Sequence, residues 1–400
     1  MKILHVVHSL VPGEYRGGIS KVAHELAAAQ ARAGHLVEVL TTTMNSRVPT
    51  DIAAGTVTPV DGVTIRYFHA AGSRGARGYS PTLRQHLLEV ASGFDALHGH
   101  NPLTPLSRYL AEAARRSGPP LFTHLHGALN PYGQQSWYRY FRRLAYVRCI
   151  EAAAMRANQG LFCLSEHESR EAVKLLGFDN TRIIPNGTSL AGKPIQADGQ
   201  RFRERYQLGD APVLLFMGRI FSIKGVHLLA EAFVQLAAER PDLRLVLVGS
   251  REQFPDYVAQ VDAILAPWSH RVTWTGFLND QQKFDALSAA TVFCHPSESE
   301  GMAMAVLEAM AAGAPCLLGK GCFMKDAATA GAILECEFAA ESIRRQAHRL
   351  LHDDSLRQHL ARRGPEHIAA HHSWDAIAQQ TISAYGGASV SNMQASSRAA

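Results

Sequence analysis

The sequence has few cysteines, and they show no pairing pattern. Its 400 residues include six cysteines, with no CxxC pair and no Cys/His spacing typical of a metal site. Scattered cysteines of this kind are typical of reduced thiols in a cytosolic protein and argue against a disulfide framework. We therefore expect a cytoplasmic protein without a bound metal.

Long hydrophobic runs and strong charge are also absent. No apolar run reaches the roughly 20 residues that a membrane-spanning helix needs, so any membrane contact would be peripheral. The opening MKILHVVHSL is too short for a signal peptide with its cleavage site, and it predicts a first buried strand instead. The formal charge of +5 is only mildly basic. It favours anionic ligands weakly and predicts no nucleic-acid partner.

Two common nucleotide-binding motifs are missing as well. The chain contains neither the dinucleotide fingerprint GxGxxG nor the P-loop GxxxxGK[ST]. The glycine-rich segment Gly72–Gly78 follows a strand without opening a helix, which predicts a flexible basic loop. Any phosphate-binding site must therefore be built from other features.

The patterns that are present indicate two α/β domains. The length is too great for one ordinary core, and 46% hydrophobic with 19% charged residues fits a soluble globular enzyme. Short apolar runs alternate with helical patterns in both halves, which predicts two doubly wound Rossmann-like domains. The strands are predicted at 2–8, 37–40, 63–68, 95–98, 121–125, 161–164 and 182–184, then at 213–217, 243–248, 272–275, 292–295 and 315–318. The helices are predicted at 19–33, 104–116 and 166–176, then at 225–239, 255–266, 280–289, 303–312, 338–352 and 355–370.

The domain boundary is predicted near residue 190. A turn at 184–187 precedes a polar passage at 191–211, so the domains are expected at 1–190 and 191–372. The tail 387–400 lacks apolar periodicity and is predicted to be disordered. Ligands of open α/β sheets bind beyond the carboxyl ends of the strands, and we expect those ends to face each other across a cleft.

One glutamate is isolated in an apolar helix. Between Gly301 and Leu318, Glu308 is the only charged residue. An ionised carboxylate in such surroundings is costly unless it is hydrogen-bonded. It is either a solvated or Arg-held structural carboxylate or part of a ligand site, and spacing alone does not decide. Glu300 lies eight positions earlier, in the loop before the same helix.

The clearest phosphate-binding candidates lie upstream of these glutamates. Gly218 and Arg219 end a strand, and Lys224 with Gly225 opens the next helix. Two cations beside a helix N-terminus suit a diphosphate, although a basic loop that caps a strand would look the same. Residues 300–304 supply a second helix N-terminus. Together with a carboxylate that can hold vicinal hydroxyls, these features describe a site for a nucleotide sugar.

The motif order resembles a known family. GRIFSIKG, WTGF and HPSESEGMAMAVLEAMAAGAP closely resemble the C-terminal half of the family 4 retaining glycosyltransferases, which have the GT-B fold. In the first half the resemblance rests on Gly17-Gly18, AAAQARAGHLVEVLT, HLHGALNP, CLSEHE and IIPNGT. The ending HSWDAIAQQTISAY looks like the closing helix of the family, which implies that 373–386 crosses back onto the first domain.

The resemblance implies a role for each matching residue. Arg219 and Lys224 would neutralise the donor diphosphate, Glu308 would hold the ribose hydroxyls, and Glu300 would contact the transferred sugar. His126 would reach that sugar from the first, acceptor-binding domain. The remaining donor-binding positions are backbone groups of Gly18, Gly218, Gly301, Met302, Ala303 and Met304.

The implied reaction is transfer of a sugar from a nucleoside diphosphate to an acceptor hydroxyl, with retention of configuration and without a metal or cofactor. The implied acceptor is a glycan or a lipid-linked glycan in surface polysaccharide assembly. Two alternatives are a nucleotide-sugar epimerase on the same fold and a catalytically silent sugar-nucleotide-binding subunit.

One departure from the family pattern concerns the loop before Glu308. The usual EGFG is here Glu300-Gly301-Met302-Ala303. Alanine cannot adopt positive φ cheaply, so we expect the loop to stay near right-handed conformations. The departure bears on the identity of the sugar more than on the reaction.

Some histidines and one serine have structural explanations. We expect His98 and His100 to line or pack the sheet edge, and His24 to be structural. Ser165 is either a ligand contact or a helix N-cap.

The segment 136–148, SWYRYFRRLAYVR, carries four arginines and no acid. On a helix, Trp137, Phe141 and Leu144 would fall on one side and Arg139, Arg142 and Arg143 away from it. The segment is either a packed helix with a solvated basic face or an interfacial helix on an anionic membrane, through these three arginines.

Overall fold

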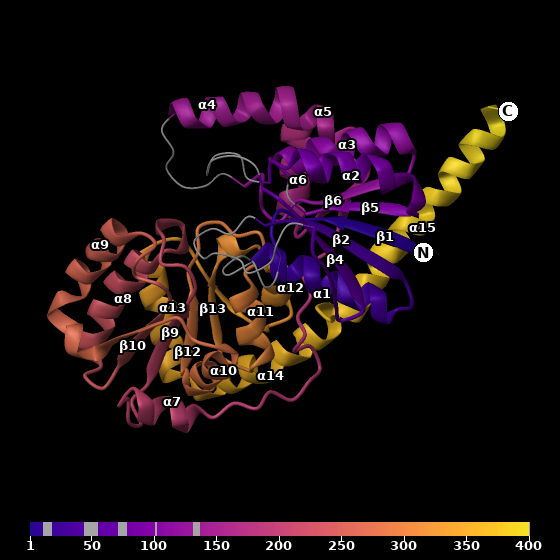
Figure 1. Ribbon diagram of the computed structural model, residues 1–400. Helices are drawn as coiled ribbons and strands as arrows, with labels where there is room; N and C mark the ends of the chain where they lie inside the picture. Colours follow the sequence, from indigo (N-terminus) through magenta and orange to yellow (C-terminus); the bar gives the residue numbers. More distant parts are fainter. Residues whose placement is uncertain (11–17, 44–54, 71–77, 101, 131–136, 400) are drawn as a thin grey trace. The chain divides into compact units, whose positions relative to one another are not determined.

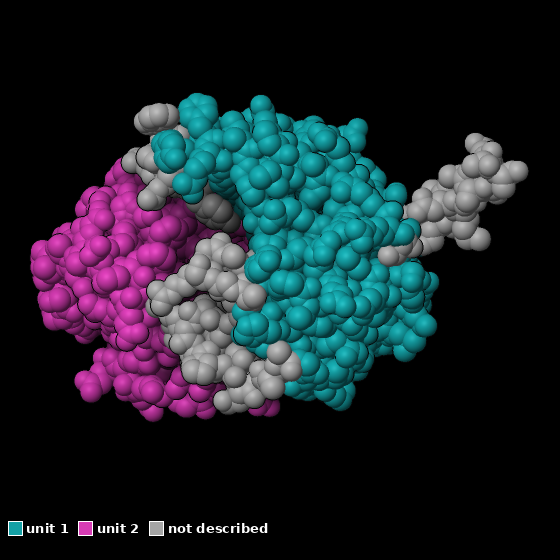
Figure 2. Space-filling model, turned by 45° about the horizontal axis from the view of Figure 1, so that its top comes forward, with its two compact units in different colours: residues 1–130, 135–187, 374–400 teal, residues 131–134, 188–373 magenta. Residues whose placement is uncertain are grey.

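The computed structural model describes residues 1–10, 18–43, 55–70, 78–100, 102–130 and 137–399. The chain folds as two compact units, coloured separately in Figure 2. The first comprises 1–130, 135–187 and 374–400, and the second 131–134 and 188–373. Within the described residues the chain passes between the units at 187/188 and 373/374, where the sequence predicts 190/191 and 372/373.

The first unit is built on an eight-stranded sheet (Figure 1). The strand order is β3-β4-β2-β1-β5-β6-β7-β8, and every pairing is parallel except β3 with β4. From β1 the chain builds the sheet to one side through β2 and then returns to the other side through β5. The strands are β1 (Lys2–Val6), β2 (Leu36–Thr42), β3 (Val57–Val60), β4 (Val63–Phe68), β5 (Ala96–Gly99), β6 (Leu121–His124), β7 (Asn158–Cys163) and β8 (Thr181–Ile183).

Helices pack against this sheet through alternating apolar residues. Leu4 and Leu97 share a buried cluster with leucines of α2 and α3. The sequence analysis missed α2, which begins after an N-cap at Ser80 whose side chain accepts from the Leu83 N–H. The helices are α1 (Gly18–Arg32), α2 (Pro81–Val90), α3 (Pro105–Ser117), α4 (Trp137–Tyr146), α5 (Ala152–Met155), α6 (Glu166–Leu176) and α15 (Trp374–Ala399), with short turns η1 (Ala91–Gly93) and η2 (Val147–Glu151).

Helix α15 belongs to the first unit and packs along α1. Arg32 of α1 forms an ion pair with Asp375 at 2.9 Å, and the Trp374 indole N–H donates to Glu25. The helical backbone continues to Ala399, whereas the sequence predicts a disordered tail from residue 387. The tail contains four alanines, the best helix formers, and a helix extends more readily than it starts once its packed first turns have nucleated it.

The second unit is a six-stranded, fully parallel sheet in the order β11-β10-β9-β12-β13-β14. Hydrophobic clusters cover both of its faces, which confirms the predicted doubly wound class. The strands are β9 (Val213–Met217), β10 (Arg244–Val248), β11 (Val272–Gly276), β12 (Val292–His295), β13 (Cys316–Gly319) and β14 (Leu334–Cys336).

The helices of this unit connect its parallel strands, and such crossovers are right-handed in nearly all proteins. Helix α7 interrupts the segment 191–211, where the sequence predicts only a polar passage. Its N-cap Asp198 accepts from the Arg201 N–H, and Phe202 is buried. The helices are α7 (Gly199–Arg205), α8 (Val226–Glu239), α9 (Pro255–Leu265), α10 (Asp280–Ala289), α11 (Met304–Ala311), α12 (Lys325–Thr329), α13 (Ala340–His352) and α14 (Asp354–His371), with turns η3 (Ser222–Lys224), η4 (Ala266–Arg271) and η5 (Lys320–Cys322).

Across the described residues, none of the helices combines the length and the apolar character needed to cross a bilayer.

Candidate functional site

The second unit has a topological switch point between β9 and β12. The chain leaves β9 toward β10 and β11, then crosses back to place β12 on the other side of β9. At such a point the connections leave in opposite directions, and a crevice opens beyond the carboxyl ends of the two strands. Gly218 and Arg219 follow β9 there, and His295 is the last residue of β12.

A buried charge cluster occupies this edge. The Lys224 ammonium forms an ion pair with Glu300 Oε1, and His295 Nε2 donates to the same oxygen at 3.0 Å. All three residues are buried, with His295 only 1% exposed. The His295 ring also stacks on Phe216 of β9, with centroids 5.4 Å apart. One carboxylate oxygen therefore holds together the end of β12 and the η3 turn before α8.

The partners of Glu300 determine its charge. Burial alone would raise its pKa, but the Lys224 charge and the His295 hydrogen bond outweigh burial and hold the pKa of Glu300 well below its usual range. Glu300 is therefore ionised at neutral pH. It offers a ligand an acceptor, whereas a protonated acid would not.

The loop between β12 and α11 is pressed against its neighbours. The Glu298 N–H donates to Ile223 O at 2.8 Å, and the Glu300 N–H donates to Gly321 O at 2.8 Å. A Cβ on Gly321 would lie 2.0 Å from Glu298 O, so only glycine permits this approach. The position of Glu300 is thus set by backbone contacts to two other loops.

Two buried polar atoms at this edge have no hydrogen-bond partner among the described residues. They are His295 Nδ1 and Ser299 Oγ. Most buried polar groups in native proteins are paired. Each of them therefore keeps a hydrogen-bonding capacity that the described residues do not use.

The N-terminus of α11 follows this loop. Ala303 is the N-cap, with φ −71° and ψ 120°, and its methyl side chain makes no capping bond. Its φ is negative, as the sequence predicts, but the backbone is extended and not right-handed. The prediction of a right-handed conformation is wrong, because an extended residue also avoids positive φ and still lets the backbone turn into the helix. The first N–H groups of α11 lack a side-chain cap.

Glu308 lies one turn into α11 and is 5% exposed. Its Oε2 is 3.1 Å from the ammonium of Lys283 in α10, and Lys283 also contacts Asp280 at 3.0 Å. The charged partner of the buried carboxylate is therefore a lysine, where the sequence suggested an arginine. The sequence analysis missed Lys283 because its partner is brought near only by the packing of α10 against the switch-point strands.

The structure brings some predicted residues of the second unit together and leaves others apart. Lys224 and Glu300 form one cluster around Gly218 and His295, while Glu308 pairs with Lys283. Arg219 is exposed beyond β9. The backbone positions Gly301, Met302, Ala303 and Met304 connect Glu300 to the helix that carries Glu308.

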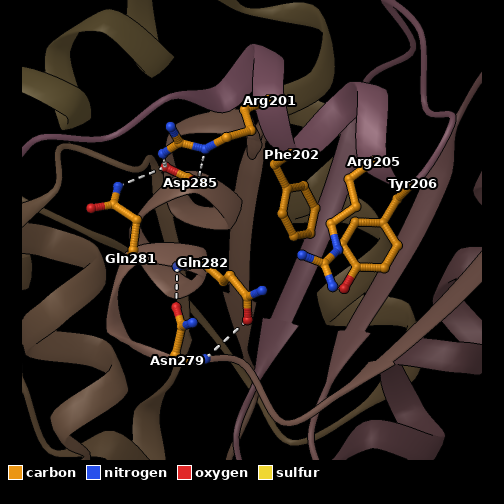
Figure 3. Close-up of a pocket in the computed structure, with 8 residues that line it drawn as sticks. All are labelled: Arg201, Phe202, Arg205, Tyr206, Asn279, Gln281, Gln282 and Asp285. Carbon is orange, nitrogen blue, oxygen red and sulfur yellow. Dashed lines mark hydrogen bonds and ion pairs between the residues drawn. The ribbon is translucent and has the colours of Figure 1, made fainter.

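A separate hollow of about 220 Å³ lies between α7 and α10 (Figure 3). An ion pair of Arg201 with Asp285, at 2.7 Å, occupies one side of it. Within the described part of the chain, no predicted site residue lines this hollow. Its lining consists of Arg201, Phe202, Arg205, Tyr206, Asn279, Gln281, Gln282 and Asp285.

The first unit carries His126 and Gly18. His126 follows β6 with φ 52°, an uncommon left-handed conformation for a residue with a side chain. The carboxylate of Glu168 holds this turn, because it accepts from the Gly127 N–H and, at 2.7 Å, from the Leu164 N–H. Gly18 is the exposed first residue of α1, whereas Gly17 and the predicted basic loop at 72–77 lie outside the described residues.

Burial raises the pKa of Glu168 to about 7, although the two backbone hydrogen bonds oppose the shift. The folded protein thus keeps a proton on Glu168 from about pH 4.5 to about pH 7, where the unfolded chain has lost it. The contribution of this proton to the free energy of unfolding is present at low pH and is lost as the pH rises through that window.

We therefore expect Glu168→Gln, which resembles the protonated acid, to flatten the pH dependence of stability. Between pH 5 and pH 8 the free energy of unfolding should fall by on the order of 3 kcal/mol more in the wild-type protein than in the variant. Urea denaturation at the two pH values measures the difference. Glu166→Gln, which changes an exposed glutamate in the same helical turn, should keep the wild-type slope. Parallel curves for wild type and Glu168→Gln would contradict the assignment.

Other sequence expectations have clear outcomes. His98 and His100 are fully buried, so they pack inside the first unit and do not line a surface. His24 bonds to Asp61 at 2.9 Å. Ser165 is the N-cap of α6, because its side chain accepts from the Glu168 N–H.

Three groups in the described residues bring potential metal-ligand atoms within 4.8 Å of one another. Two of them share histidines that are already hydrogen-bonded to each other in the first unit. The three groups are His5/His98/His100, His100/His124/His126 and Asp326/His367/His372.

Comparison with known proteins agrees with this architecture. Residues 198–367 match the family model "Glycosyl transferases group 1", and residues 17–187 match "Glycosyl transferase 4-like domain". The chain is 30% identical over 247 residues to the UDP-Gal:alpha-D-GlcNAc-diphosphoundecaprenol alpha-1,3-galactosyltransferase of Escherichia coli. That match covers 58% of this chain and 60% of the relative, which is less than two thirds of its length.

Solved structures show the same fold. Sucrose-phosphate synthase from Thermosynechococcus elongatus superposes with a TM-score of 0.75 at 21% identity, covering 98% of this chain and 99% of that chain. Anabaena HepE in complex with UDP-glucose gives a TM-score of 0.76 at 18% identity, covering 97% and 100%. Both comparisons extend over nearly the whole of each chain.

Proposed function

Since its two units match these two family models, the chain belongs to the GT-B glycosyltransferases of group 1, and we propose that it transfers a sugar from a nucleoside diphosphate to an acceptor hydroxyl. The observation that carries the proposal is the cluster of Lys224, Glu300 and His295 at the switch point of the second sheet. A buried cation, an ionised acceptor and an uncapped helix N-terminus at one sheet edge suit a phosphorylated sugar.

In this proposal the leaving diphosphate is stabilised by fixed charges. Lys224 and the exposed Arg219 supply cations beside the carboxyl end of β9, and the first N–H groups of α11 supply partial positive charge. Glu300 accepts a hydrogen bond from a hydroxyl of the transferred sugar. Glu300 holds the Lys224 ammonium, so in this proposal a bound donor shares that ammonium between the carboxylate and the phosphate.

Glu308 is proposed to bind the two ribose hydroxyls. Its carboxylate is buried, and Lys283 keeps one oxygen in place. Ala305, one turn before Glu308 on α11, has a small side chain that is only partly buried, which leaves room for a ribose to approach. Lys283 is then a positioning residue that the sequence motif does not include.

The proposed reaction is metal-independent and retaining. Incubation with UDP-, GDP- and ADP-hexoses, with thermal shift used first to select the donor, should give a product with the anomeric configuration of the donor. UDP-hexoses come first, because the Escherichia coli relative is named for UDP-Gal and the HepE structure holds UDP-glucose. EDTA should leave the rate unchanged, since lysine, arginine and helix N–H groups carry the charge stabilisation.

Two outcomes would contradict this proposal. Loss of activity in EDTA that a divalent ion restores would contradict metal independence. A new epimer of the donor in the absence of acceptor would indicate an epimerase in place of a transferase. NMR of the anomeric protons distinguishes all these products.

We propose a glycan or lipid-linked acceptor, and peripheral contact with an anionic membrane at the cytoplasmic face through α4. This helix exposes three aromatic side chains, with Tyr138, Tyr140 and Phe141 each at least half exposed. Arg142 is exposed beside them. Exposed aromatics next to cations are typical of a helix that lies in a bilayer interface.

The structure corrects two details of the basic helix. Arg143 is not a solvated cation, because it donates to the backbone carbonyls of Asn130 at 3.0 Å and Ala128 at 2.6 Å. Phe141 is 58% exposed and does not form a packed apolar face. The side chain of Arg139 lies outside the described residues.

Replacing Phe141 and Arg142 of α4, and the exposed Arg148 in η2 directly after it, with serine should weaken binding to vesicles of anionic phospholipid roughly tenfold, through lost apolar insertion and lost charge. Cosedimentation at low and high salt measures the change. Arg170→Ser with Lys174→Ser, which removes two exposed cations from α6 of the same unit, should bind as wild type. Equal binding by the two variants would contradict a membrane role for α4.

A further inference from the structure

Five histidines form a stacked group inside the first unit. They come from three neighbouring strands and their carboxyl ends: His5 on β1, His98 and His100 at β5, and His124 and His126 at β6. The sheet register pairs His5 with His98. Within each HxH pair the period of two puts both rings on one face of the sheet, and the rings stack at 4.4 Å and 5.0 Å.

Hydrogen bonds join these rings into one chain that passes through two other side chains. The chain runs from the carbonyl after β8 to the turn after β6, by way of Tyr385 on α15 and Gln30 on α1. Its links are Ile184 O to His124 Nε2 at 3.2 Å, His124 Nδ1 to His98 Nε2 at 3.0 Å, His98 Nδ1 to Tyr385 OH at 2.5 Å, Tyr385 OH to Gln30 Nε2 at 3.2 Å, Gln30 Oε1 to His5 Nε2 at 2.7 Å, His5 Nδ1 to His100 Nε2 at 2.8 Å, and His100 Nδ1 to His126 Nε2 at 3.1 Å.

Every ring in this chain is neutral at pH 7. Burial lowers the pKa of His5 and of His124 to about 4. Burial, with repulsion from neighbouring rings, places the pKa of His98, His100 and His126 well below the ordinary value. A neutral imidazole has one N–H donor and one lone pair. A ring that donates in one hydrogen bond must therefore accept in the other.

In the first half of the hydrogen-bond chain the donors and acceptors are determined, because this half begins at a carbonyl oxygen. Ile184 O only accepts, so His124 Nε2 carries the proton and His124 Nδ1 the lone pair. His98 Nε2 must then donate to that lone pair, which leaves His98 Nδ1 to accept from the Tyr385 O–H. Burial raises the pKa of Tyr385, so its hydroxyl keeps this proton.

The second half follows from Gln30. Its amide nitrogen donates to the Tyr385 oxygen and, at 2.9 Å, to Thr381 Oγ1, whose own proton goes to Ala378 O. A flipped amide would point its oxygen at two hydroxyls whose protons are already committed. Gln30 Oε1 therefore accepts from His5 Nε2.

Because each neutral ring donates with one nitrogen and accepts with the other, the remaining donors and acceptors of the hydrogen-bond chain follow. His5 Nδ1 accepts from His100 Nε2, and His100 Nδ1 accepts from His126 Nε2. The last ring, His126, is left with its lone pair on Nδ1.

We propose that Gln30 and Tyr385 are positioning residues that hold His126 as the neutral Nε2–H tautomer, so that Nδ1 presents a lone pair to a ligand hydroxyl. His126 is the partly exposed end of the chain, and its ring cannot rotate without breaking its bond to His100. A lone pair at Nδ1 accepts from a hydroxyl and repels a phosphate or carboxylate oxygen. Only the assignment of that hydroxyl to the donor sugar or the acceptor rests on the proposed function.

The tautomer is measured on the ligand-free chain by NMR with 15N-labelled histidine rings, using His126→Asn to identify the signals. In wild-type protein Nδ1 of His126 should show the shift of an unprotonated nitrogen and Nε2 that of a protonated one. A protonated Nδ1 would overturn the inference. This readout needs no substrate, so it is independent of the proposed function.

Tyr385→Phe removes the linking hydroxyl but keeps the ring that packs on Phe122 at 5.1 Å. The amide of Gln30 then loses one of its two constraints, and His126 should show a mixture of tautomers. Glucosyl or galactosyl transfer should fall about tenfold in kcat with little change in the donor KM. Tyr109→Phe removes a buried hydroxyl from the other face of the same unit and should leave the His126 signals unchanged.

A pure Nε2–H tautomer in Tyr385→Phe would show that Tyr385 has no positioning role and would overturn that part of the proposal. If Tyr385→Phe does not fold, Gln30→Met provides the same test, because it too interrupts the chain. A mixed tautomer in Tyr385→Phe, together with a wild-type protein that transfers no sugar, would support the inference and contradict the proposed function.

Discussion

Replacing Lys224 with methionine is expected to lower kcat/KM for sugar transfer by about 10²–10³, the usual effect of removing one preorganised charge from a developing anion. Lys224 is 8% exposed, and its ammonium lies against Glu300 at the switch point of the second sheet. A buried cation in this position needs little reorganisation when charge develops on the leaving diphosphate. The loss should therefore appear mainly in kcat.

The same substitution should also destabilise the protein, and the two effects can be separated. Lys224→Met leaves the Glu300 carboxylate buried without its lysine partner, and breaking a buried pair costs about 3–5 kcal/mol. In the double variant Lys224→Met with Glu300→Gln, the uncompensated charge is gone, so stability should recover in large part while activity stays low. Recovery of activity together with stability would show that Lys224 is structural only.

Lys320→Met is the matched control for this experiment. Lys320 lies in η5 on the same edge of the sheet and pairs with Glu337 in solvent. Because both partners are exposed, this variant should retain wild-type stability and kinetics. A kinetic loss as large as that of Lys224→Met would mean that general positive charge, and not the buried ammonium, assists the reaction.

Glu308→Gln is expected to raise the Kd of the nucleoside diphosphate roughly 10- to 100-fold, because hydrogen bonds to a charged group are worth about 1.5–3 kcal/mol. The amide keeps the shape of the side chain, which is 5% exposed, but it loses the charge that faces Lys283 at 3.1 Å. Calorimetric titration with the free nucleoside diphosphate measures the effect without catalysis. The same change should appear in the donor KM.

Asp280→Asn separates this role from the structural ion pair. Asp280 is the second partner of Lys283, at 3.0 Å, but its side chain is 82% exposed. Its loss should leave Kd within about twofold of wild type, since an exposed pair contributes little. If Asp280→Asn and Glu308→Gln weaken binding equally, the function of Glu308 is to anchor Lys283, and the proposed ribose contact is contradicted.

The sequence predicts the α/β architecture well because its signal is local. Strands such as β9 and β12 are buried on both faces, so they are continuous apolar runs, and the helices between them carry amphipathic patterns. The elements that were missed are short or polar, such as β3 and α7. Among the described strands, β3 is a four-residue edge strand whose only pairing is with the adjacent β4. Helix α7 depends on a neighbour far away in the sequence, because Asp285 of α10 stabilises it through Arg201.

The candidate site was predictable to the extent that it follows a motif. Glu300, Glu308, Arg219 and Lys224 are found from their spacing. Their pairing is not, because Lys224 meets Glu300 only when the η3 turn packs beneath the 296–300 loop. Likewise, Lys283 of α10 becomes the partner of Glu308 only through helix packing.

The sequence by itself determined which side chains lie on the same face and at the same end of the sheet. The period of two places His98 with His100 and His124 with His126, and the parallel strand order puts all four at one end of the sheet. Only the tertiary structure decided how these rings are protonated. That decision needs Ile184, which follows the edge strand β8, and Gln30 and Tyr385 from two helices, because a hydrogen-bond chain acquires its direction from the group at its end.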